Sequence, residues 1–177
     1  LILDGLFKHN GYGNQSKILD CACGIGTQSI GLASLGYQVS ASDISAGEIS
    51  EARERAKKNG VNIRFELADF RALADKYSEQ FDVVIAMDNA LPHMLSNKDL
   101  EAAIKSMTGQ TKPNGIIVAS IRDYDALLMD KPPYSPPYIH KTVKGQRVSF
   151  QTWSWEGDNY RLIQYIVDDE DALQVSK

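Results

Sequence analysis

Short apolar runs alternate with longer amphipathic stretches along the first two thirds of the chain. The runs that are rich in strand-forming residues are 17–21, 37–42, 61–67, 81–87 and 116–121. Helical patterns separate them, and this alternation is typical of βαβ units that build a parallel sheet. Run 81–87 is apolar almost throughout, which indicates a strand buried on both faces. The predicted fold class is therefore α/β, with a doubly wound, Rossmann-like and mostly parallel sheet.

Capping residues mark several of the predicted helix boundaries. Gly36 ends a helix over residues 29–35, because glycine adopts the left-handed closing conformation without strain. Ser45 and Glu48 have the spacing of a capping box, in which a hydroxyl and a carboxylate satisfy free amides at a helix start. Ser96 is placed to cap a later helix through its hydroxyl.

The character of the chain changes after residue 122. Residues 112–115, Lys-Pro-Asn-Gly, predict a turn into the last parallel strand. Four of the six prolines lie in residues 131–138, which predicts a loop because proline cannot donate to a helix or a central strand. Segments 146–155 and 160–167 are rich in β-formers and joined by residues 156–159, which predicts a C-terminal antiparallel β-hairpin region.

The length of 177 residues suits one domain with a single sizeable core. We expect a single domain over residues 1–177, with a core at 17–125 and a loop and hairpin region at 126–177. Hydrophobic residues make up 43% and charged residues 24%, which is typical of a globular protein in water. The chain opens with Leu1 and not with methionine, so the sequence leaves open whether natural residues precede it.

Charge and hydropathy exclude two classes of partner. Lys and Arg total 19 against 23 Asp and Glu, giving a formal net charge of -4. No basic field therefore attracts phosphate backbones, and we expect no nucleic-acid partner. The apolar runs are a few residues long, whereas a membrane span needs about 20, so no membrane partner is expected either. A small-molecule substrate is the expected partner, and a homo-oligomer is left open.

The cysteine content bears on the compartment and on metal binding. Cys21 and Cys23 are too few for a disulfide scaffold and suit a reducing compartment, so we predict a cytoplasmic location. A closed zinc site takes four ligands, whereas this chain offers two thiols and the scattered His9, His93 and His140. No metal site is expected.

A glycine-bearing turn follows the first predicted strand at the edge where open α/β sheets bind ligands. Gly24 and Gly26 would let the backbone approach a cofactor closely, because a Cβ there would occupy ligand space. Asp43 ends the second strand, 23 positions after Asp20, where a carboxylate can accept both hydroxyls of a ribose. Two plainer interpretations stay open: a turn that needs glycine for its conformation alone, and an Asp43 that only caps a helix.

The same geometry also serves nicotinamide cofactors. A dinucleotide fingerprint places a third small residue after two intervening positions, and Ser29 fits that requirement poorly. This disfavours a dehydrogenase, although the glycine turn and Asp43 alone do not exclude one.

Residues 18–27, Ile-Leu-Asp-Cys-Ala-Cys-Gly-Ile-Gly-Thr, resemble motif I of class I S-adenosylmethionine-dependent methyltransferases, with Ala22 where many members carry a glycine. Residues 87–93 and 120–125 are similar to the corresponding stretches of glycine and sarcosine N-methyltransferases. The resemblance implies S-adenosyl-L-methionine as cofactor. The residues expected to bind it are Asp20, Ala22, Cys23, Gly24, Gly26, Asp43, Ile44, Asp69, Phe70, Met87 and His93.

Substrate contacts follow from the same resemblance. Asn89 and Arg122 would hold a substrate carboxylate, and Tyr124 would orient the amine. Methyl transfer is an in-line displacement that depends on positioning, and a guanidinium binds a carboxylate through two parallel bonds. The amine attacks as the neutral base, which it can reach by losing a proton to water, so we name no catalytic base. Plainer roles also stay open: packing for Tyr124, a structural histidine at His93, and for Arg122 a surface ion pair.

Two features depart from the family pattern. The family's N-terminal segment over the cofactor and its last sheet strands are not evident in residues 1–15 or after residue 167. Asp88 stands where the family often has a small residue, and its charge near the pocket could alter amine selectivity.

Trp153 and Trp155 alternate on a strand and are expected to pack on one face.

The sequence therefore predicts an enzyme, an S-adenosylmethionine-dependent methyltransferase that N-methylates a small amino acid or a related carboxylated amine. Three alternatives stay open. One is another small-molecule acceptor, methylated on oxygen or nitrogen. The others are an NAD-dependent oxidoreductase and a non-catalytic binding protein that keeps the fold.

Overall fold

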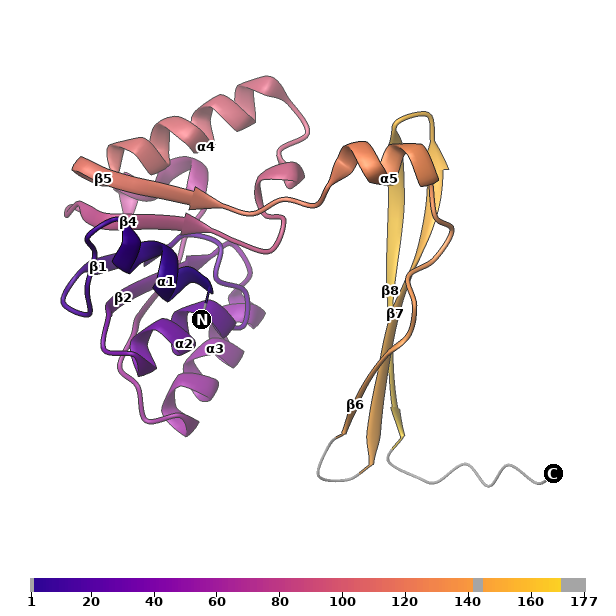
Figure 1. The fold of residues 1–177 in the computed structure, drawn as a ribbon, viewed down its shortest axis with the longest axis horizontal. Helices are drawn as coiled ribbons and strands as arrows, with labels where there is room; N and C mark the ends of the chain where they lie inside the picture. The colour runs from indigo at the N-terminus through magenta and orange to yellow at the C-terminus, as the bar shows by residue number, and fades with distance from the viewer. Residues whose placement is uncertain (1, 142–144, 170–177) are drawn as a thin grey trace. The chain divides into compact units, whose positions relative to one another are not determined.

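The computed structural model describes residues 2–141 and 145–169, drawn from indigo to yellow in Figure 1. The chain divides into two compact units, with the boundary between Arg122 and Asp123. Each unit has its own sheet. The outer ends of the predicted domain, residue 1 and residues 170–177, lie outside the described residues. That the whole chain forms one domain stays a prediction.

Five parallel strands form the sheet of the first unit, in the order β3-β2-β1-β4-β5. The strand order reverses beside β1, which pairs with β2 on one side and β4 on the other. This confirms the doubly wound α/β class, whose ligand crevice lies at the carboxyl ends of such strands. The bounds are β1 Lys17–Asp20, β2 Gln38–Asp43, β3 Arg64–Leu67, β4 Phe81–Ala86 and β5 Thr111–Ala119.

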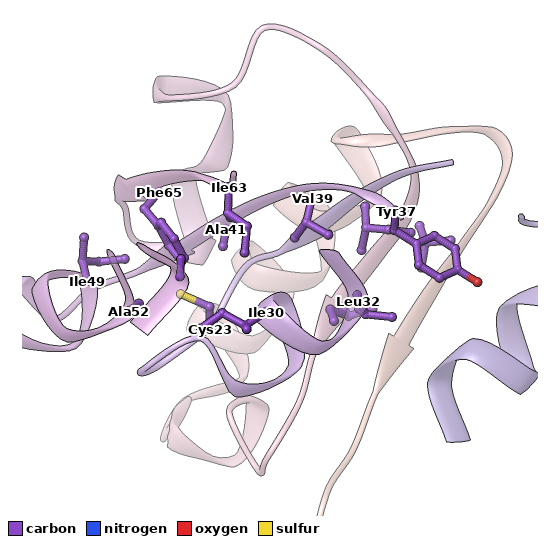
Figure 2. Packing of buried hydrophobic residues seen from close by; sticks show 14 of the residues in the cluster. Cys23, Ile30, Leu32, Tyr37, Val39, Ala41, Ile49, Ala52, Ile63 and Phe65 are labelled. Carbon is purple, nitrogen blue, oxygen red and sulfur yellow. The ribbon is translucent and has the colours of Figure 1, made fainter. Parts of the chain in front are cut away.

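Helices cover both faces of this sheet (Figure 1). One buried cluster joins α1, α2 and α3 to one face, and a second joins η1 and α4 to the other. Figure 2 shows the first cluster, in which side chains of α2 and α3 meet those of β2 and β3. The bounds are α1 Ile2–His9, α2 Thr27–Ser34, α3 Ala46–Lys58, η1 Phe70–Asp75, η2 Leu91–His93 and α4 Asn97–Gly109.

The central strands are buried on both faces, as the apolar run 81–87 predicts. On β4, Val83 packs into the first cluster and Val84 into the second, because alternate side chains of a strand point to opposite faces. On β1, Ile18 and Leu19 divide in the same way. All four side chains are fully buried.

Capping places α3 where the sequence predicts it. The Ser45 hydroxyl accepts a hydrogen bond from the Glu48 amide at 3.3 Å, so the predicted helix start is confirmed. A capping box would also have the Ser45 amide donate to the Glu48 carboxylate. In the structure this amide donates to Asp43 Oδ1 instead, at 2.9 Å. Ser96 accepts from the Asp99 amide at 3.1 Å, which confirms the start of α4.

The turn predicted at residues 112–115 lies within β5. Thr111 pairs with Phe81 and Ile116 with Val83, so the β5 side of the ladder carries extra residues and bulges. Asn114 adopts a left-handed φ of 65° in the bulge. The strand therefore begins earlier than the predicted run 116–121, because Thr111 pairs with β4 before the chain loops out.

An N-terminal helix, α1, is a further element that the sequence pattern did not reveal. Phe7 is fully buried and its ring meets Tyr37 edge to face, with 5.8 Å between the centroids. The Tyr37 hydroxyl donates to Asp4 at 2.9 Å. Burial together with this carboxylate raises the pKa of Tyr37 to about 12.

The second unit consists of a short helix and a three-stranded antiparallel sheet in the order β6-β7-β8. The predicted hairpin is confirmed, with Glu156 opposite Asn159 and Gly157 at a left-handed φ of 62°. The proline-rich segment is largely irregular but contributes a bridge between Tyr134 and Thr152. Helix α5 and strand β6 were not predicted. The bounds are α5 Tyr124–Asp130, β6 Tyr138–Lys141, β7 Gln146–Glu156 and β8 Asn159–Asp169.

The β5 bulge leaves no room for a side chain at Gly115. A Cβ there would lie 2.7 Å from Thr111 Cγ2 and 2.9 Å from the Asp82 carbonyl oxygen. We expect Gly115→Ala to lower the free energy of unfolding by about 1–3 kcal/mol, measured by urea denaturation. Gly109→Ala is the matched control, because nothing lies within 4 Å of its Cβ position. Equal midpoints for the two variants would contradict this account.

Candidate functional site

The glycine turn between β1 and α2 forms one side of the candidate site. Gly24 and Gly26 adopt left-handed φ angles of 51° and 77°, which glycine reaches without strain. A Cβ on Gly26 would lie 3.3 Å from the Ala52 Cβ of α3. Gly26 is thus required by the backbone conformation and by packing against α3. This agrees with the interpretation that the turn needs glycine for its conformation. Close approach of a cofactor to the turn stays a prediction.

Asp43 ties the end of β2 to the glycine turn. Its Oδ2 accepts from the Gly24 amide and its Oδ1 from the Ser45 amide, each at 2.9 Å. The Cys23 amide donates to the Ser42 carbonyl at 2.9 Å, a second link between the two segments. Asp43 therefore does cap, and the same carboxylate, half-buried, lies beside the turn as the ribose prediction requires.

Asp20 lies at the carboxyl end of β1 and is only 1% exposed. Its Oδ2 accepts from the Ser29 hydroxyl at 2.6 Å. Its Oδ1 is buried and has no well-aligned hydrogen-bond donor among the described residues, although the Ala22 backbone amide is near enough to favour the charged carboxylate. Burial raises the pKa of Asp20 to about 7, and the nearby charges of Asp88 and Asp43 act in the same direction.

The segment after β4 has a constrained backbone. Asp88 and Asn89 both adopt left-handed conformations, with φ of 55° and 71°. Ser120, which follows β5, holds both residues, because its hydroxyl accepts from the Asp88 amide at 2.9 Å and its carbonyl from the Asn89 amide at 3.1 Å. The Arg122 amide donates to Asn89 Oδ1 at 3.1 Å. The structure thus brings the two predicted carboxylate-binding residues together.

Gln28 is a site residue that the sequence did not reveal. It lies in the first turn of α2 and its Nε2 donates to Asp88 Oδ2 at 2.9 Å. The only signal for it was its position two residues after Gly26, at the start of the helix that follows the glycine turn.

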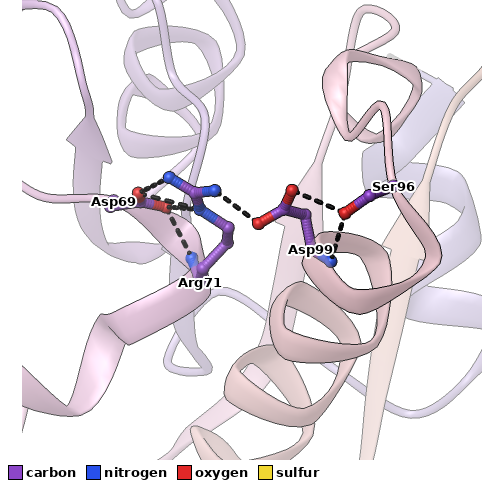
Figure 3. Close-up of polar contacts among 4 residues, drawn as sticks. All are labelled: Asp69, Arg71, Ser96 and Asp99. Atoms are coloured by element: carbon purple, nitrogen blue, oxygen red, sulfur yellow. Dashed lines mark hydrogen bonds and ion pairs between the residues drawn. The ribbon is translucent and has the colours of Figure 1, made fainter.

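Asp69, one of the predicted cofactor-binding residues, is held by Arg71 (Figure 3). Arg71 Nη2 donates to Asp69 Oδ2 at 2.6 Å, and Arg71 Nη1 donates to Asp99 Oδ1 at 2.7 Å. The Ser96 hydroxyl donates to the other Asp99 oxygen at 2.7 Å. Hydrogen bonding to Arg71 lowers the pKa of Asp69, while the bond from Ser96, followed by Arg71, lowers that of Asp99.

This network links the end of β3 to the start of α4. The side chains of Arg71 and Asp99 are 37% and 40% exposed, so the ion pair adds little stability in water. Its effect is to fix the direction of the Asp69 carboxylate. Arg71 was not predicted, because an arginine two residues after an aspartate is common and its second partner is 28 positions away.

The remaining predicted cofactor residues have mixed surroundings. Met87 packs against the first core cluster and Phe70 against the second. Ile44 is 68% exposed just after β2, and His93 is exposed in η2. The other two lie in the glycine turn: Ala22, half-buried, and Cys23, buried.

Tyr124 belongs to the second unit. Its ring stacks on Tyr160 with 6.4 Å between the centroids, and the two hydroxyls are 3.3 Å apart. Trp153 and Trp155 contact the same Tyr160 ring, at 5.6 Å and 4.9 Å between centroids, which confirms their packing on one face. The substrate role of Tyr124 stays a prediction.

Comparison with known proteins agrees with this geometry. Residues 18–115, more than half of the chain, match the family described as a methyltransferase domain. The chain belongs to the class I S-adenosylmethionine-dependent methyltransferases.

Relatives of this methyltransferase differ in their acceptors. It is 29% identical over 113 residues to a glycine/sarcosine N-methyltransferase of Halorhodospira halochloris, matching 64% of this chain and 42% of the relative. It is 32% identical over 130 residues to a ubiquinone biosynthesis O-methyltransferase of Azoarcus sp. (strain BH72), matching 72% of this chain and 54% of the relative. The matched part of the chain thus corresponds to about half of the length of each of these relatives.

A solved structure shares the fold. The S-adenosylmethionine-bound CalS10 of Micromonospora echinaspora, an amino pentose methyltransferase, matches with a TM-score of 0.67 at 14% identity. The match covers 94% of this chain and 80% of that one. It therefore includes elements of both units.

Among residues 2–141 and 145–169, no helix is both long enough and apolar enough to cross a bilayer. Nor does the same part of the chain bring three or more His, Cys, Asp or Glu side chains together where they could hold a metal ion. Cys21 and Cys23 are free thiols, and burial raises the pKa of both.

The burial of Asp20 makes stability depend on pH. Because its pKa is raised to about 7, the native state keeps a proton that the unfolded chain loses from about pH 4 upward. This contribution to the free energy of unfolding therefore falls as pH rises from about 4 to about 7. We expect Asp20→Asn to become more stable relative to wild type at pH 8 than at pH 5, measured by urea denaturation. A pH-independent difference between the two proteins would contradict it.

Proposed function

We propose that this methyltransferase binds S-adenosyl-L-methionine at the carboxyl ends of β1, β2 and β4 and transfers its methyl group to a small amine. The observation that carries the proposal is the meeting, at one sheet edge, of the glycine turn, Asp43 and the buried Asp20. Family membership supports the same location, because residues 18–115 contain all three features.

The chemistry of the crevice fits a cationic cofactor. S-adenosyl-L-methionine carries a sulfonium and an ammonium group, and the buried Oδ1 of Asp20 lacks a donor that such a ligand could supply. Asp43 and Asp88 add negative charge beside Asp20. The pyrophosphate of a nicotinamide cofactor is anionic and would be repelled by these carboxylates. The electrostatics therefore favour the methyl donor over the dinucleotide.

Three further residues have assigned roles in this proposal. Asp43 would accept from the ribose hydroxyls, since a carboxylate offers more lone pairs than its two amide donors use. Asp69 would accept from the adenine amino group while Arg71 fixes its direction. His93, after β4, would line the cofactor site.

The cofactor supplies a methyl group activated by the positive sulfur, and the protein supplies position. In our proposal Arg122 binds the acceptor carboxylate through two parallel bonds and Asn89 supports it from the adjoining segment. Holding the amine lone pair in line with the methyl carbon provides most of the rate gain.

We place the acceptor among small amino acids and related carboxylated amines, which the resemblance to glycine and sarcosine N-methyltransferases supports. An oxygen acceptor is the second candidate, because the Azoarcus relative is an O-methyltransferase by name. A cytoplasmic location and homo-oligomer formation remain predictions from sequence.

The direct test is mass spectrometry of methyl transfer to a panel of small amines, phenols and acids. Thermal-shift measurements with S-adenosylhomocysteine and with NADH complement it, since a ligand at about 100 times its Kd adds roughly 2.7 kcal/mol. Stabilisation by NADH alone would favour the oxidoreductase. Stabilisation by S-adenosylhomocysteine without any methylated product would indicate the non-catalytic binding protein.

Asp43→Asn tests the proposed ribose contact. We expect about ten-fold weaker binding of S-adenosylhomocysteine in calorimetry, because a charge-assisted hydrogen bond is lost. The 2′,3′-dideoxy analogue lacks both hydroxyls, so its affinity should differ little between the variant and wild type. Equal losses for both ligands would assign Asp43 a purely structural role.

Arg122→Met tests carboxylate binding. We expect the KM for glycine to rise at least about ten-fold, because a bidentate guanidinium contact is lost, with the Kd for S-adenosylhomocysteine unchanged. Ethylamine, which has no carboxylate, should be methylated equally well by both proteins. An unchanged KM for glycine would refute the assignment.

A further inference from the structure

The chain after β4 holds Asp88 in a conformation that few residues adopt. Its φ of 55° and that of Asn89 place two consecutive residues other than glycine in the left-handed region, which costs conformational energy. Three hydrogen bonds to Ser120 compensate: its amide donates to the Ala86 carbonyl at 3.2 Å, and the Asp88 and Asn89 amides donate to it. The ends of β4 and β5 therefore fix the position of Asp88.

The side chain of Asp88 reaches across to the helix that follows the glycine turn. Gln28 Nε2 donates to its Oδ2 at 2.9 Å, and Gln28 lies just after Gly26 at the start of α2. The carboxylate is close enough to Asp20 to help raise its pKa. Asp88 thus lies at the crevice between β1 and β4, on the side of the proposed cofactor site.

The charge of Asp88 is not neutralised within the part of the chain that the structure describes. There, the carboxylate accepts one side-chain hydrogen bond, from Gln28, and forms no ion pair. The residue is exposed, so a ligand can reach it. An uncharged amide that orients the carboxylate leaves its charge available to a substrate.

We propose that Asp88 is the residue that selects an amine acceptor, by accepting a hydrogen bond from the attacking nitrogen. This inference rests on the proposed function and adds to it a group that touches the reacting atom.

The charge movement of the reaction supports this role. As the nitrogen lone pair forms the N–CH3 bond, the S–CH3 bond breaks, its electron pair stays on sulfur, and the positive charge moves to nitrogen. A hydrogen bond from the nitrogen to Asp88 then becomes charge-assisted, so it is stronger in the transition state than in the ground state. The methylated ammonium afterwards releases its proton to water.

The same carboxylate disfavours oxygen acceptors. A phenol attacks as the phenolate, whose negative charge would lie against Asp88 with Asp20 and Asp43 nearby. Like-charge contact of this kind gives selectivity by repulsion. Asp88 therefore favours nitrogen acceptors over oxygen acceptors, the two classes that the N- and O-methyltransferase relatives represent by name.

Two variants remove the charge without disturbing the backbone. Asp88→Asn and Asp88→Gly both suit the left-handed conformation, so neither should lower the melting temperature. We expect each to lower kcat for glycine and for ethylamine at least about ten-fold, since Asp88→Asn replaces a charged acceptor by a neutral one and Asp88→Gly removes the acceptor. The Kd for S-adenosylhomocysteine should change far less than kcat, because this ligand lacks the sulfonium charge and the proposed hydrogen bond of Asp88 is to the acceptor.

Matched controls isolate the role of the charge. Asp75→Asn removes an exposed carboxylate of η1 outside the site and should leave every parameter unchanged. Gln28→Leu keeps the charge but removes its orienting hydrogen bond, so its kcat should fall between those of wild type and Asp88→Asn. In competition between ethylamine and catechol, Asp88→Asn should lower the amine-to-phenol ratio of kcat/KM about ten-fold or more.

The outcomes separate this inference from the proposed function. If wild type methylates amines and both Asp88 variants keep its kcat and its amine-to-phenol ratio, the Asp88 assignment is wrong while the proposed function stands. If wild type methylates phenols and no amine, the proposed acceptor class and the role of Asp88 are both overturned.

Discussion

The pairing of β1 with β2 on one side and β4 on the other is the constraint on which the site depends. Because all three strands run parallel, their carboxyl ends meet at one edge, and the residues that follow them converge. Asp20, Asp43 and Asp88 reach the crevice from three different strands. None of these carboxylates could form the site alone, so the sheet order is what makes their charges act together.

Several acidic side chains at one sheet edge repel one another, and each is accommodated by a different local contact. Asp20 is buried with one oxygen satisfied by Ser29, and its pKa is raised to about 7. Asp43 gains two backbone amides, whereas Asp69 lies farther along the same edge and is paired with Arg71. Asp20 Oδ1 thus stays buried without a well-aligned donor, which a bound ligand would provide. Such a group lowers stability in the free protein and is expected at a site selected for binding.

The two units differ in how their interiors are built. The first unit buries aliphatic side chains on both faces of a parallel sheet. The second packs aromatic rings on an antiparallel sheet, with Trp153, Trp155 and Tyr160 on one face and the stacked pair of Phe150 and Tyr165 on the other. An aromatic cluster around Tyr160 needs only one hairpin and one helix to form, because each ring covers a large area.

By itself, the sequence determined the α/β class, the succession of the main strands and helices along the chain, the helix starts at Ser45 and Ser96, and the hairpin, because these follow from local periodicity and capping. It also singled out Asp43 through its position at the end of the second strand, and Asp20 through the resemblance to motif I. The order of the strands within the sheet came from the tertiary structure. Only the tertiary structure decided the β5 bulge, the left-handed Asp88, the hydrogen bond from Gln28 and the docking of α1. Each of these depends on partners tens of residues away, whose meeting is a property of the folded sheet and leaves no local pattern in the chain.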